Sequence, residues 1–355
     1  MKLLLAGGGT GGHIFIGVAL AQEWKSRTQR GEILFVGARG RLEEKLVPKA
    51  GIPLELLKVS QLKGVSPLRQ IAGVARLPAV LFRCLRVVRD FRPHVAIGIG
   101  GYASGPAILA ASILGVPTMI VEPNVNPGLA NRWLSRAVRL ATVAFPETRR
   151  FFGSKARVTG IPVRKAFFQA QRPRPDHFLL LVFGGSQGSR AINAAVAEAL
   201  PLLKQSIPSL QVIHQTGPSE FEEYRRRQSD WWSTTPFIDD MATAVASASV
   251  VVCRAGAATI AELAAAGKCA LLVPFPFASD DHQTRNAEYL AAQGAAILLP
   301  QSELTGARLA DAMLDLYRHP EKRSDMEAAI RRFSHPGSAE AIIDLALGLI
   351  DAPDG

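Results

Sequence analysis

The chain has 355 residues, of which 48% are hydrophobic and 20% charged, so it holds enough apolar sequence for two domains with their own cores. It contains no run of 18 or more uncharged apolar residues, and the sequence therefore predicts no membrane-spanning helix. The net charge of +11 suggests an anionic partner, which could be nucleic acid, anionic lipid or a phosphorylated substrate.

Three cysteines, Cys84, Cys253 and Cys269, lie among apolar neighbours and show neither paired nor metal-ligand spacing. This pattern predicts buried free thiols in a reducing cytoplasm. The chain begins with Met1-Lys2 and a short apolar run. We interpret this run as a first strand, because it is too short for the apolar part of a signal peptide and no cleavage site follows.

The first strand is expected over residues 2–6, followed by the glycine-rich turn Gly7–His13 and a helix from Ile14. His13 stands at the mouth of this turn, where strand ends point toward a ligand in this class of sheet. It is either a structural hydrogen-bonding residue or a catalytic base, because a neutral imidazole titrates near working pH.

The same turn matches a nucleotide-binding pattern. Gly7, Gly9 and Gly12 satisfy G-x-G-x-x-G, which by itself is a weak indication of dinucleotide binding. An NAD site would also need an acid near the end of the second strand, expected over residues 33–36. No acid is there, although Arg39 could meet a 2′-phosphate.

Apolar residues recur at helical spacing between residues 65 and 92, interrupted by Pro78. The stretch has one acid, Asp90, and six basic residues: Arg69, Arg76, Arg83, Arg86, Arg89 and Arg92. A cationic, apolar helix pair of this kind can lie on an anionic bilayer. A helix that packs on the core and exposes a basic face to solvent is the alternative.

Further strands are expected over residues 95–99, 117–121 and 138–143. The first of these leads into a second glycine-rich turn, residues 100–106. Asn124 follows the second strand, where it could hydrogen-bond a polar ligand or form an ordinary turn.

A segment dense in Pro and Arg, residues 160–175, is interpreted as a linker between domains. Beyond it, a buried strand over 178–183, the turn Gly184–Arg190 and a helix from Ala191 repeat the opening of the chain. Two similar doubly wound halves are the simplest explanation.

In the second half, the apolar run 250–253 predicts a buried strand, and Arg254–Glu262 a small-residue turn that opens a helix through Ala266. The N–H groups at such a helix start can hold a phosphate. Glu262, about one and a half turns into the helix, would then reach sugar hydroxyls. An ordinary strand-to-helix turn with a solvated Glu262 is the alternative.

Other acids in this half are given structural roles. Asp239 and Asp240 follow a strand at 211–215 and are expected to cap a short helix. The run Asp280-Asp281-His282, after a strand at 270–273, is not expected to bind a metal, because consecutive residues diverge and no second cluster completes a ligand set.

In their order along the chain, the motifs resemble those of the MurG family of N-acetylglucosaminyltransferases. The matching segments are 7–13, 98–106, 122–132, 184–190, 237–241, 253–262 and 280–286. The resemblance implies the α/β fold called GT-B, with two Rossmann-like doubly wound parallel-sheet domains facing a cleft. It divides the chain into an acceptor- and membrane-facing domain, 1–163 with a returning helix at 337–355, and a UDP-sugar-binding domain, 164–336.

The resemblance also implies an inverting reaction that moves N-acetylglucosamine from its UDP ester to the 4-hydroxyl of a lipid-linked muramyl pentapeptide. His13 would take the proton from that hydroxyl, and no cofactor or metal is expected. The residues implied for UDP-N-acetylglucosamine are Thr10, Gly11, Gly12, Asn124, Arg164, Ser186, Ile238, Ala257, Ala258, Thr259, Glu262 and Gln283.

The acceptor of the family is a membrane lipid, so the resemblance implies a peripheral location on the cytoplasmic face of the inner membrane. Other cell-wall synthesis proteins are possible further partners. The residues then expected to dock on the membrane are Arg69, Arg76, Leu77, Leu81, Phe82, Arg83 and Arg86.

Three alternatives remain at this point. The chain could be another GT-B transferase that uses a UDP-sugar on a different lipid acceptor. A nicotinamide-dependent oxidoreductase would use the first glycine turn but leave the second glycine set unexplained. A nucleic-acid binder would explain the charge, yet the arginines are interleaved with aliphatic residues and not with a stacking surface, so we expect no nucleic-acid partner.

Overall fold

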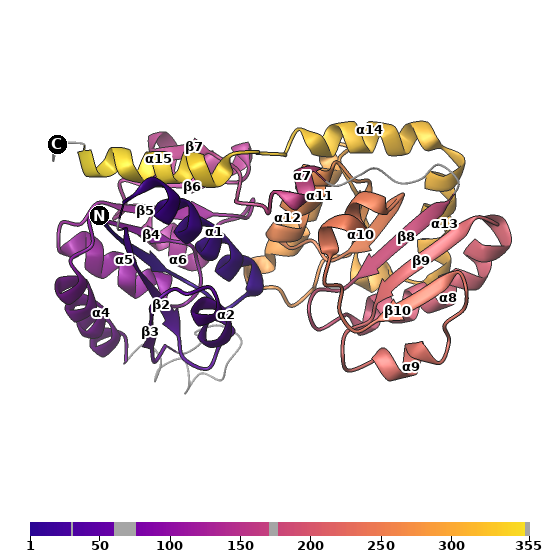
Figure 1. Ribbon diagram of the computed structural model, residues 1–355. Coiled ribbons are helices and arrows are strands. Elements are labelled where there is room, and N and C mark those ends of the chain that lie inside the picture. Colours follow the sequence, from indigo (N-terminus) through magenta and orange to yellow (C-terminus); the bar gives the residue numbers. More distant parts are fainter. Residues whose placement is uncertain (30, 60–75, 170–176, 352–355) are drawn as a thin grey trace. The chain divides into compact units, whose positions relative to one another are not determined.

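The computed structural model describes residues 1–29, 31–59, 76–169 and 177–351. The chain forms two compact units, one of residues Met1–Val163 with Gly337–Gly355 and the other of residues Arg164–Pro336. Each unit is a parallel β-sheet covered by helices (Figure 1). No helix within the described ranges is long and apolar enough to cross a membrane.

The first unit contains a seven-stranded sheet with strand order β3-β2-β1-β4-β5-β6-β7, in which every neighbouring pair is parallel. Its strands are β1 (Lys2–Ala6), β2 (Glu32–Ala38), β3 (Leu54–Leu57), β4 (Val95–Gly98), β5 (Thr118–Glu122), β6 (Leu140–Val143) and β7 (Ala156–Val158). Within its described residues, the α-helices are α1 (Gly11–Arg27), α2 (Glu43–Lys49), α4 (Leu77–Phe91), α5 (Ser104–Ile113), α6 (Leu129–Leu134) and α15 (Ser338–Asp351). Two 3-10 helices, η1 (Pro146–Phe151) and η2 (Gly153–Lys155), follow β6.

The last helix of the chain returns to this unit. In Figure 1, α15 lies alongside α1, and the Arg27 guanidinium is 2.6 Å from the Asp344 carboxylate. The inner face of α15 buries Ile342, Ile343 and Ala346. Apolar burial along one face therefore holds the two helices together, with an ion pair at the rim.

The second unit contains a six-stranded parallel sheet with strand order β10-β9-β8-β11-β12-β13. Its strands are β8 (Phe178–Phe183), β9 (Leu210–Gln215), β10 (Trp232–Thr235), β11 (Val250–Cys253), β12 (Ala270–Leu272) and β13 (Ile297–Leu298). Its α-helices are α7 (Ala166–Gln169), α8 (Arg190–Ser206), α9 (Phe221–Arg225), α10 (Met241–Ser247), α11 (Ala257–Ala266), α12 (His282–Ala292), α13 (Gly306–Arg318) and α14 (Pro320–Arg331). Short 3-10 helices are η3 (Ser279–Asp281) and η4 (Gln301–Glu303).

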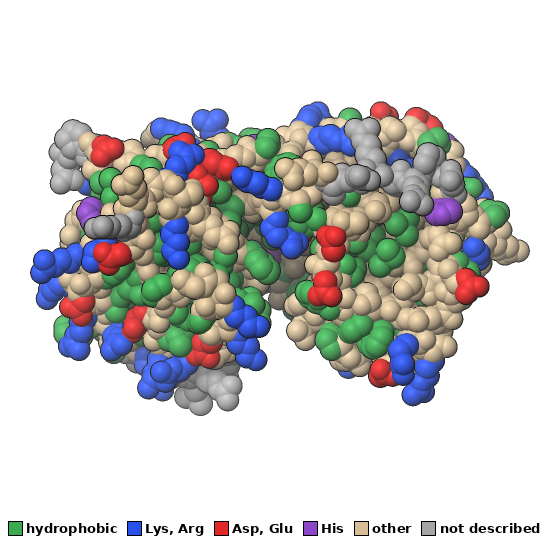
Figure 2. Space-filling view, viewed as in Figure 1, with side chains coloured by type: hydrophobic (Ala, Val, Ile, Leu, Met, Phe, Trp, Pro, Cys, Tyr) green, Lys and Arg blue, Asp and Glu red, His purple; other side chains and the backbone are tan. Residues whose placement is uncertain are grey.

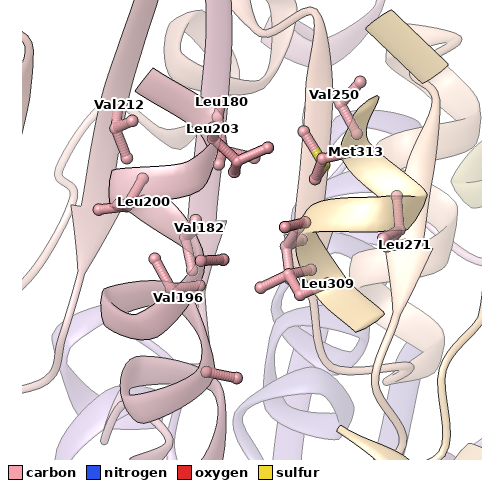
Figure 3. Close-up of a cluster of buried hydrophobic side chains, with 14 of the residues drawn as sticks. Leu180, Val182, Val196, Leu200, Leu203, Val212, Val250, Leu271, Leu309 and Met313 are labelled. Atoms are coloured by element: carbon pink, nitrogen blue, oxygen red, sulfur yellow. The ribbon is translucent and has the colours of Figure 1, made fainter. Parts of the chain in front are cut away.

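Figure 3 shows the core on one face of this sheet. Side chains from β8 and β11, such as Val182 and Val250, meet Leu200 of α8 and Leu309 and Met313 of α13. Strands buried this completely must be apolar along their whole length, which explains the continuous runs seen in the sequence.

The prediction of an α/β fold with two doubly wound sheets is confirmed, and so are the three buried, free cysteines. The strands expected at 2–6, 178–183 and 250–253 have the predicted bounds. Asp240 caps α10 as expected, with its carboxylate accepting from Thr243 N at 3.1 Å.

The structure adds detail to other expectations. The helical pattern interrupted at Pro78 corresponds to the start of α4, since Pro78 occupies the first turn of this helix, where its missing N–H costs nothing. Arg69 and residues 65–75 lie outside the described residues. The helix expected from residue 286 begins at His282. Within the expected linker, residues 166–169 form α7, and residues 170–175 lie outside the described residues.

Candidate active site

In the first unit, two glycine turns meet where the strand order reverses. β1 and β4 are neighbours, with Ala6 paired to Gly98, and each is followed by a turn. Gly8 N donates to Gly100 O at 3.2 Å, and a Cβ on Gly101 would lie 2.2 Å from Gly8 O. Glycine is therefore required at this contact, which lies at the point where ligands bind in sheets of this class.

The His13 ring lies between Thr10 and Gly100. Thr10 is the N-cap of α1, and its Oγ1 accepts from His13 N and lies 3.0 Å from His13 Nδ1. The other ring nitrogen, Nε2, faces Gly100, where a Cβ would approach it to 2.9 Å. A base at Nε2 requires the tautomer with its proton on Nδ1, and Thr10 Oγ1 is an acceptor within reach of that proton.

Asn124 is set by a carboxylate that sequence reasoning gave no role. Glu122, the last residue of β5, is buried and its Oε1 accepts from both the backbone N–H and Nδ2 of Asn124, at 2.9 and 3.1 Å. Its Oε2 accepts from Gly128 N at 3.1 Å and Asn131 Nδ2 at 2.8 Å. Burial raises the pKa of Glu122 to about 7, against these four donors, which lower it. The clue in the sequence was a carboxylate at the end of a buried strand.

In the second unit, the corresponding turns follow β8 and β11, which are also neighbours, with Cys253 paired to Phe183. Ser186 is exposed in the turn after β8. Ala257, Ala258 and Thr259 form the partly exposed start of α11. Gly256, the N-cap, has no side chain to satisfy the first N–H groups of this helix, so they can receive an anion.

Glu262 lies on α11 opposite a cation from the start of the same unit. Arg164 Nη2 is 3.6 Å from Glu262 Oε1. Burial raises the pKa of Glu262 to about 7, and the charge of Arg164 and its hydrogen bond lower it. The guanidinium also lies over the ring of Phe167, 5.0 Å from its centroid. The two side chains assigned to the ribose and the phosphates are thus in contact with each other.

Arg254, the first residue after β11, fixes the loops around this turn, a role that the sequence did not reveal. Its guanidinium donates to Ser189 Oγ at 2.6 Å, to Gln301 Oε1 at 2.7 Å and to the carbonyls of Val273 and Pro274 at 3.2 and 2.9 Å. Burial lowers the pKa of Arg254 to about 10. Because Ser189 is the N-cap of α8, this contact joins the turns after β8 and β12.

The remaining residues predicted to bind the sugar donor, Gln283 and Ile238, lie on a helix and on a loop of the second unit. Gln283, in the first turn of α12, accepts from Phe275 N through Oε1 at 3.0 Å, so its amide orients the loop after β12. Ile238 is partly exposed beyond β10, beside Phe237, whose carbonyl accepts from Thr235 Oγ1 at 2.6 Å. Within the described ranges, no group of three His, Cys, Asp or Glu side chains could hold a metal ion.

The profile of the glycosyltransferase family 28 N-terminal domain matches residues 3–143, and that of the family 28 C-terminal domain matches residues 179–342. A relative from Syntrophus aciditrophicus, UDP-N-acetylglucosamine--N-acetylmuramyl-(pentapeptide) pyrophosphoryl-undecaprenol N-acetylglucosamine transferase, is 43% identical over 99% of both chains. The chain belongs to glycosyltransferase family 28. A relative of the same name from Myxococcus xanthus is also 43% identical and covers 99% of this chain and 93% of its own.

Solved structures agree with this family 28 assignment. The crystal structure of Acinetobacter baumannii MurG aligns with a TM-score of 0.84 at 29% identity and covers 98% of this chain and 99% of the other. The GT-B prediction is thereby confirmed. The glycosyltransferase of kitacinnamycin, with a TM-score of 0.73 and 16% identity over 97% of this chain and 99% of its own, shares the fold alone. Because the chain belongs to a glycosyltransferase family, the oxidoreductase alternative is wrong.

Proposed function

We propose that this chain transfers N-acetylglucosamine from UDP-N-acetylglucosamine to the muramyl 4-hydroxyl of undecaprenyl-pyrophosphoryl-N-acetylmuramyl-pentapeptide, which converts lipid I into lipid II in peptidoglycan synthesis. The observation that carries this proposal is the 43% identity over 99% of the chain to a transferase of that name. The site residues of both units lie within the matched length.

The nucleotide half of the donor would bind to the second unit. The N–H groups at Ala257, Ala258 and Thr259 suit the diphosphate, because a helix start combines free donors with partial positive charge. Ser186 and Arg164 would add donors to the phosphates. This assignment is supported by the adjacency of β8 and β11, which brings both turns to one edge of the sheet.

Two side chains and one backbone segment would recognise the ribose, the uracil and the sugar of UDP-N-acetylglucosamine. The Glu262 carboxylate would accept hydrogen bonds from the ribose hydroxyls, and the backbone at Ile238 would face uracil. Gln283 would read the hydroxyls of the sugar. Its amide is oriented by the hydrogen bond from Phe275 N, which supports a fixed reading geometry.

The first unit would supply the acceptor chemistry. Thr10, Gly11, Gly12 and Asn124 would contact the donor, and His13 Nε2 would take the proton of the muramyl 4-hydroxyl. The acceptor oxygen then forms a bond to the anomeric carbon as the bond to UDP breaks, which inverts the α-linked donor to a β-linked product. UDP leaves as an anion stabilised by the α11 N–H groups and Arg164, so one base suffices.

The acceptor is a membrane lipid, and α4 offers a face for peripheral docking on the cytoplasmic side of the inner membrane. Val80, Cys84 and Val88 face the core, which leaves Leu77 and Phe82 exposed. The exposed basic residues of the helix and its N-cap include Arg76, Arg83, Arg86 and Arg89. Figure 2 shows basic side chains gathered over this part of the first unit.

Two of the expected docking residues have other contacts, which narrows the proposal. Arg83 pairs with Glu55 at 2.5 Å, and Leu81 is partly buried against the core. Arg86 instead lies over the exposed ring of Phe82, 5.5 Å from its centroid. Arg76, Leu77, Phe82 and Arg86 are therefore the residues that we propose for contact with an anionic bilayer.

A transfer assay tests the proposal. It would use radiolabelled UDP-N-acetylglucosamine and a short-chain lipid-linked muramyl pentapeptide, with and without EDTA. We expect a disaccharide product that forms at the same rate with and without EDTA and much more slowly in His13→Ala. Absence of transfer to this acceptor, with transfer to a different lipid-linked sugar, would reject it.

A further inference from the structure

A buried carboxylate outside the site described above supports the first glycine turn. Glu43, the first residue of α2, has no solvent exposure. Its Oε2 accepts from Gly9 N at 3.1 Å, and its Oε1 accepts from Ala38 N at 3.0 Å. One side chain therefore joins the turn after β1 to the end of β2.

The surrounding glycines make room for this carboxylate. A Cβ on Gly8 would lie 2.3 Å from Glu43 Oε1, and a Cβ on Gly37 would lie 2.8 Å from Glu43 Cγ. Gly8 also has a φ of +136°, which other residues rarely adopt. Two small residues on neighbouring strand ends thus leave a space that the Glu43 side chain fills.

A glycine turn between a strand and a helix start is a common receptor for phosphate, because its N–H groups point at the ligand. Here the N–H of Gly9 already donates to a carboxylate of the chain itself. The next residue, Thr10, caps α1 and contacts His13. Glu43 therefore binds the residue that directly precedes Thr10, and Thr10 orients the proposed base, His13.

We propose that Glu43 is a positioning residue: its carboxylate takes the place of a bound anion in the first glycine turn and fixes the turn that orients Thr10 and His13. The inference rests on the proposed role of His13. In a variant that lacks the Glu43 carboxylate, a small oxyanion that accepts from the Gly9 and Ala38 N–H groups should restore the turn. Such rescue is expected if Glu43 positions the turn through these hydrogen bonds, and it is not expected if Glu43 only fills space.

The experiment compares Glu43→Ala, Glu43→Gln and the neighbouring control Glu44→Ala, with formate as the probe. We expect Glu43→Ala to lower kcat on the order of 100-fold, as misplaced reacting groups do, while KM for UDP-N-acetylglucosamine stays near the wild-type value. Formate should restore part of kcat in this variant. It should have no effect on wild type, on Glu44→Ala or on Glu43→Gln, where the space stays filled.

Two measurements do not depend on turnover. Formate should raise the thermal unfolding temperature of Glu43→Ala and leave that of wild type unchanged. The imidazole ¹⁵N chemical shifts of His13 should change in Glu43→Ala and in Glu43→Gln. Because Glu43→Gln keeps the side-chain volume, it provides this measurement if Glu43→Ala does not fold. Wild-type kcat in Glu43→Ala, a rise in donor KM alone, or failure of formate both to stabilise and to rescue would overturn the inference. Absence of any transfer by wild type would instead overturn the proposed function.

Discussion

Arg164 and Glu262 form an ion pair, with Nη2 3.6 Å from Oε1, between the first residue of the second unit and a helix about a hundred residues later. The pair places a cation and an anion beside α11. A nucleoside diphosphate carries the complementary set, with anionic phosphates next to neutral hydroxyls that donate hydrogen bonds. Binding would therefore exchange one protein ion pair for two interactions with the ligand.

Replacing Glu262 by Ala should weaken binding of UDP about 10- to 100-fold, because hydrogen bonds to a charged group contribute roughly 1.5–3 kcal/mol. Isothermal titration calorimetry with UDP measures this. The matched control is Glu288→Ala, an exposed acid of α12 that pairs with Arg285. Equal affinities in Glu262→Ala and wild type would remove the ribose assignment.

The affinity for UDP-N-acetylglucosamine should depend on pH through Glu262. Burial raises the pKa of this carboxyl to about 7, so it is protonated in part of the molecules near neutrality. The ionised form accepts hydrogen bonds from ribose more strongly, and we expect affinity to rise with pH until the group is fully ionised. Titrations across this range should give a flat profile for Glu262→Gln. A rise of the same size in that variant would assign the titration to another group.

Replacing His13 by Ala should lower turnover about 10²–10⁴-fold, the usual contribution of a general base. Affinity for UDP-N-acetylglucosamine should change little, because the nucleotide contacts are assigned to the second unit. Steady-state kinetics and calorimetry separate the two quantities. His319→Ala, at the exposed position that follows α13, is the control. An unchanged kcat in His13→Ala contradicts the assignment of the base.

Glu122 should make the first unit less stable as pH rises. Its folded pKa is about 7 and its ordinary value 4.5, so between these values the folded state holds a proton that the unfolded state has lost. Stability from this group therefore falls with rising pH across that window, by on the order of 3 kcal/mol, and is level above it.

Urea unfolding of a Trp231→Phe, Trp232→Phe background tests this, because the remaining Trp24 and Trp133 belong to the first unit. Glu122→Gln should be less stable at every pH, because its amide N–H group faces N–H donors, and should lack the slope. Glu147→Gln, at an exposed position of η1, should keep it. The same slope in Glu122→Gln would show that another group titrates.

Replacing both Arg76 and Arg86 by Gln should weaken binding to vesicles that contain anionic lipid. Each basic residue near such a surface contributes about 1 kcal/mol, so the double variant should bind roughly 30-fold less tightly. Sedimentation with vesicles measures this. The control is the double variant Arg308→Gln, Arg318→Gln on α13, which has the same net charge as the Arg76→Gln, Arg86→Gln variant. Equal losses in both variants would show that net charge matters and the α4 face does not.

The sequence alone determined the backbone plan. The apolar runs at β1, β8 and β11 are continuous because these strands are buried on both faces, and glycine turns mark where each ends. These turns also placed His13 and Glu262 near the ends of the strands, and the resemblance to the MurG family added Thr10. Local patterns carry this information because burial and turn geometry constrain neighbouring residues directly.

Only the tertiary structure decided the polar contacts that hold the site. Glu43 reaches Gly9 across 34 residues, and Arg254 reaches Ser189 across 65. The pairing of Arg164 with Glu262 likewise depends on how α11 faces the first residues of its unit. A buried polar side chain must find a partner, but which partner it finds is set by the loops that the strand order brings together at one sheet edge. The periodicity of apolar residues along the chain does not predict the order of the strands in the sheet.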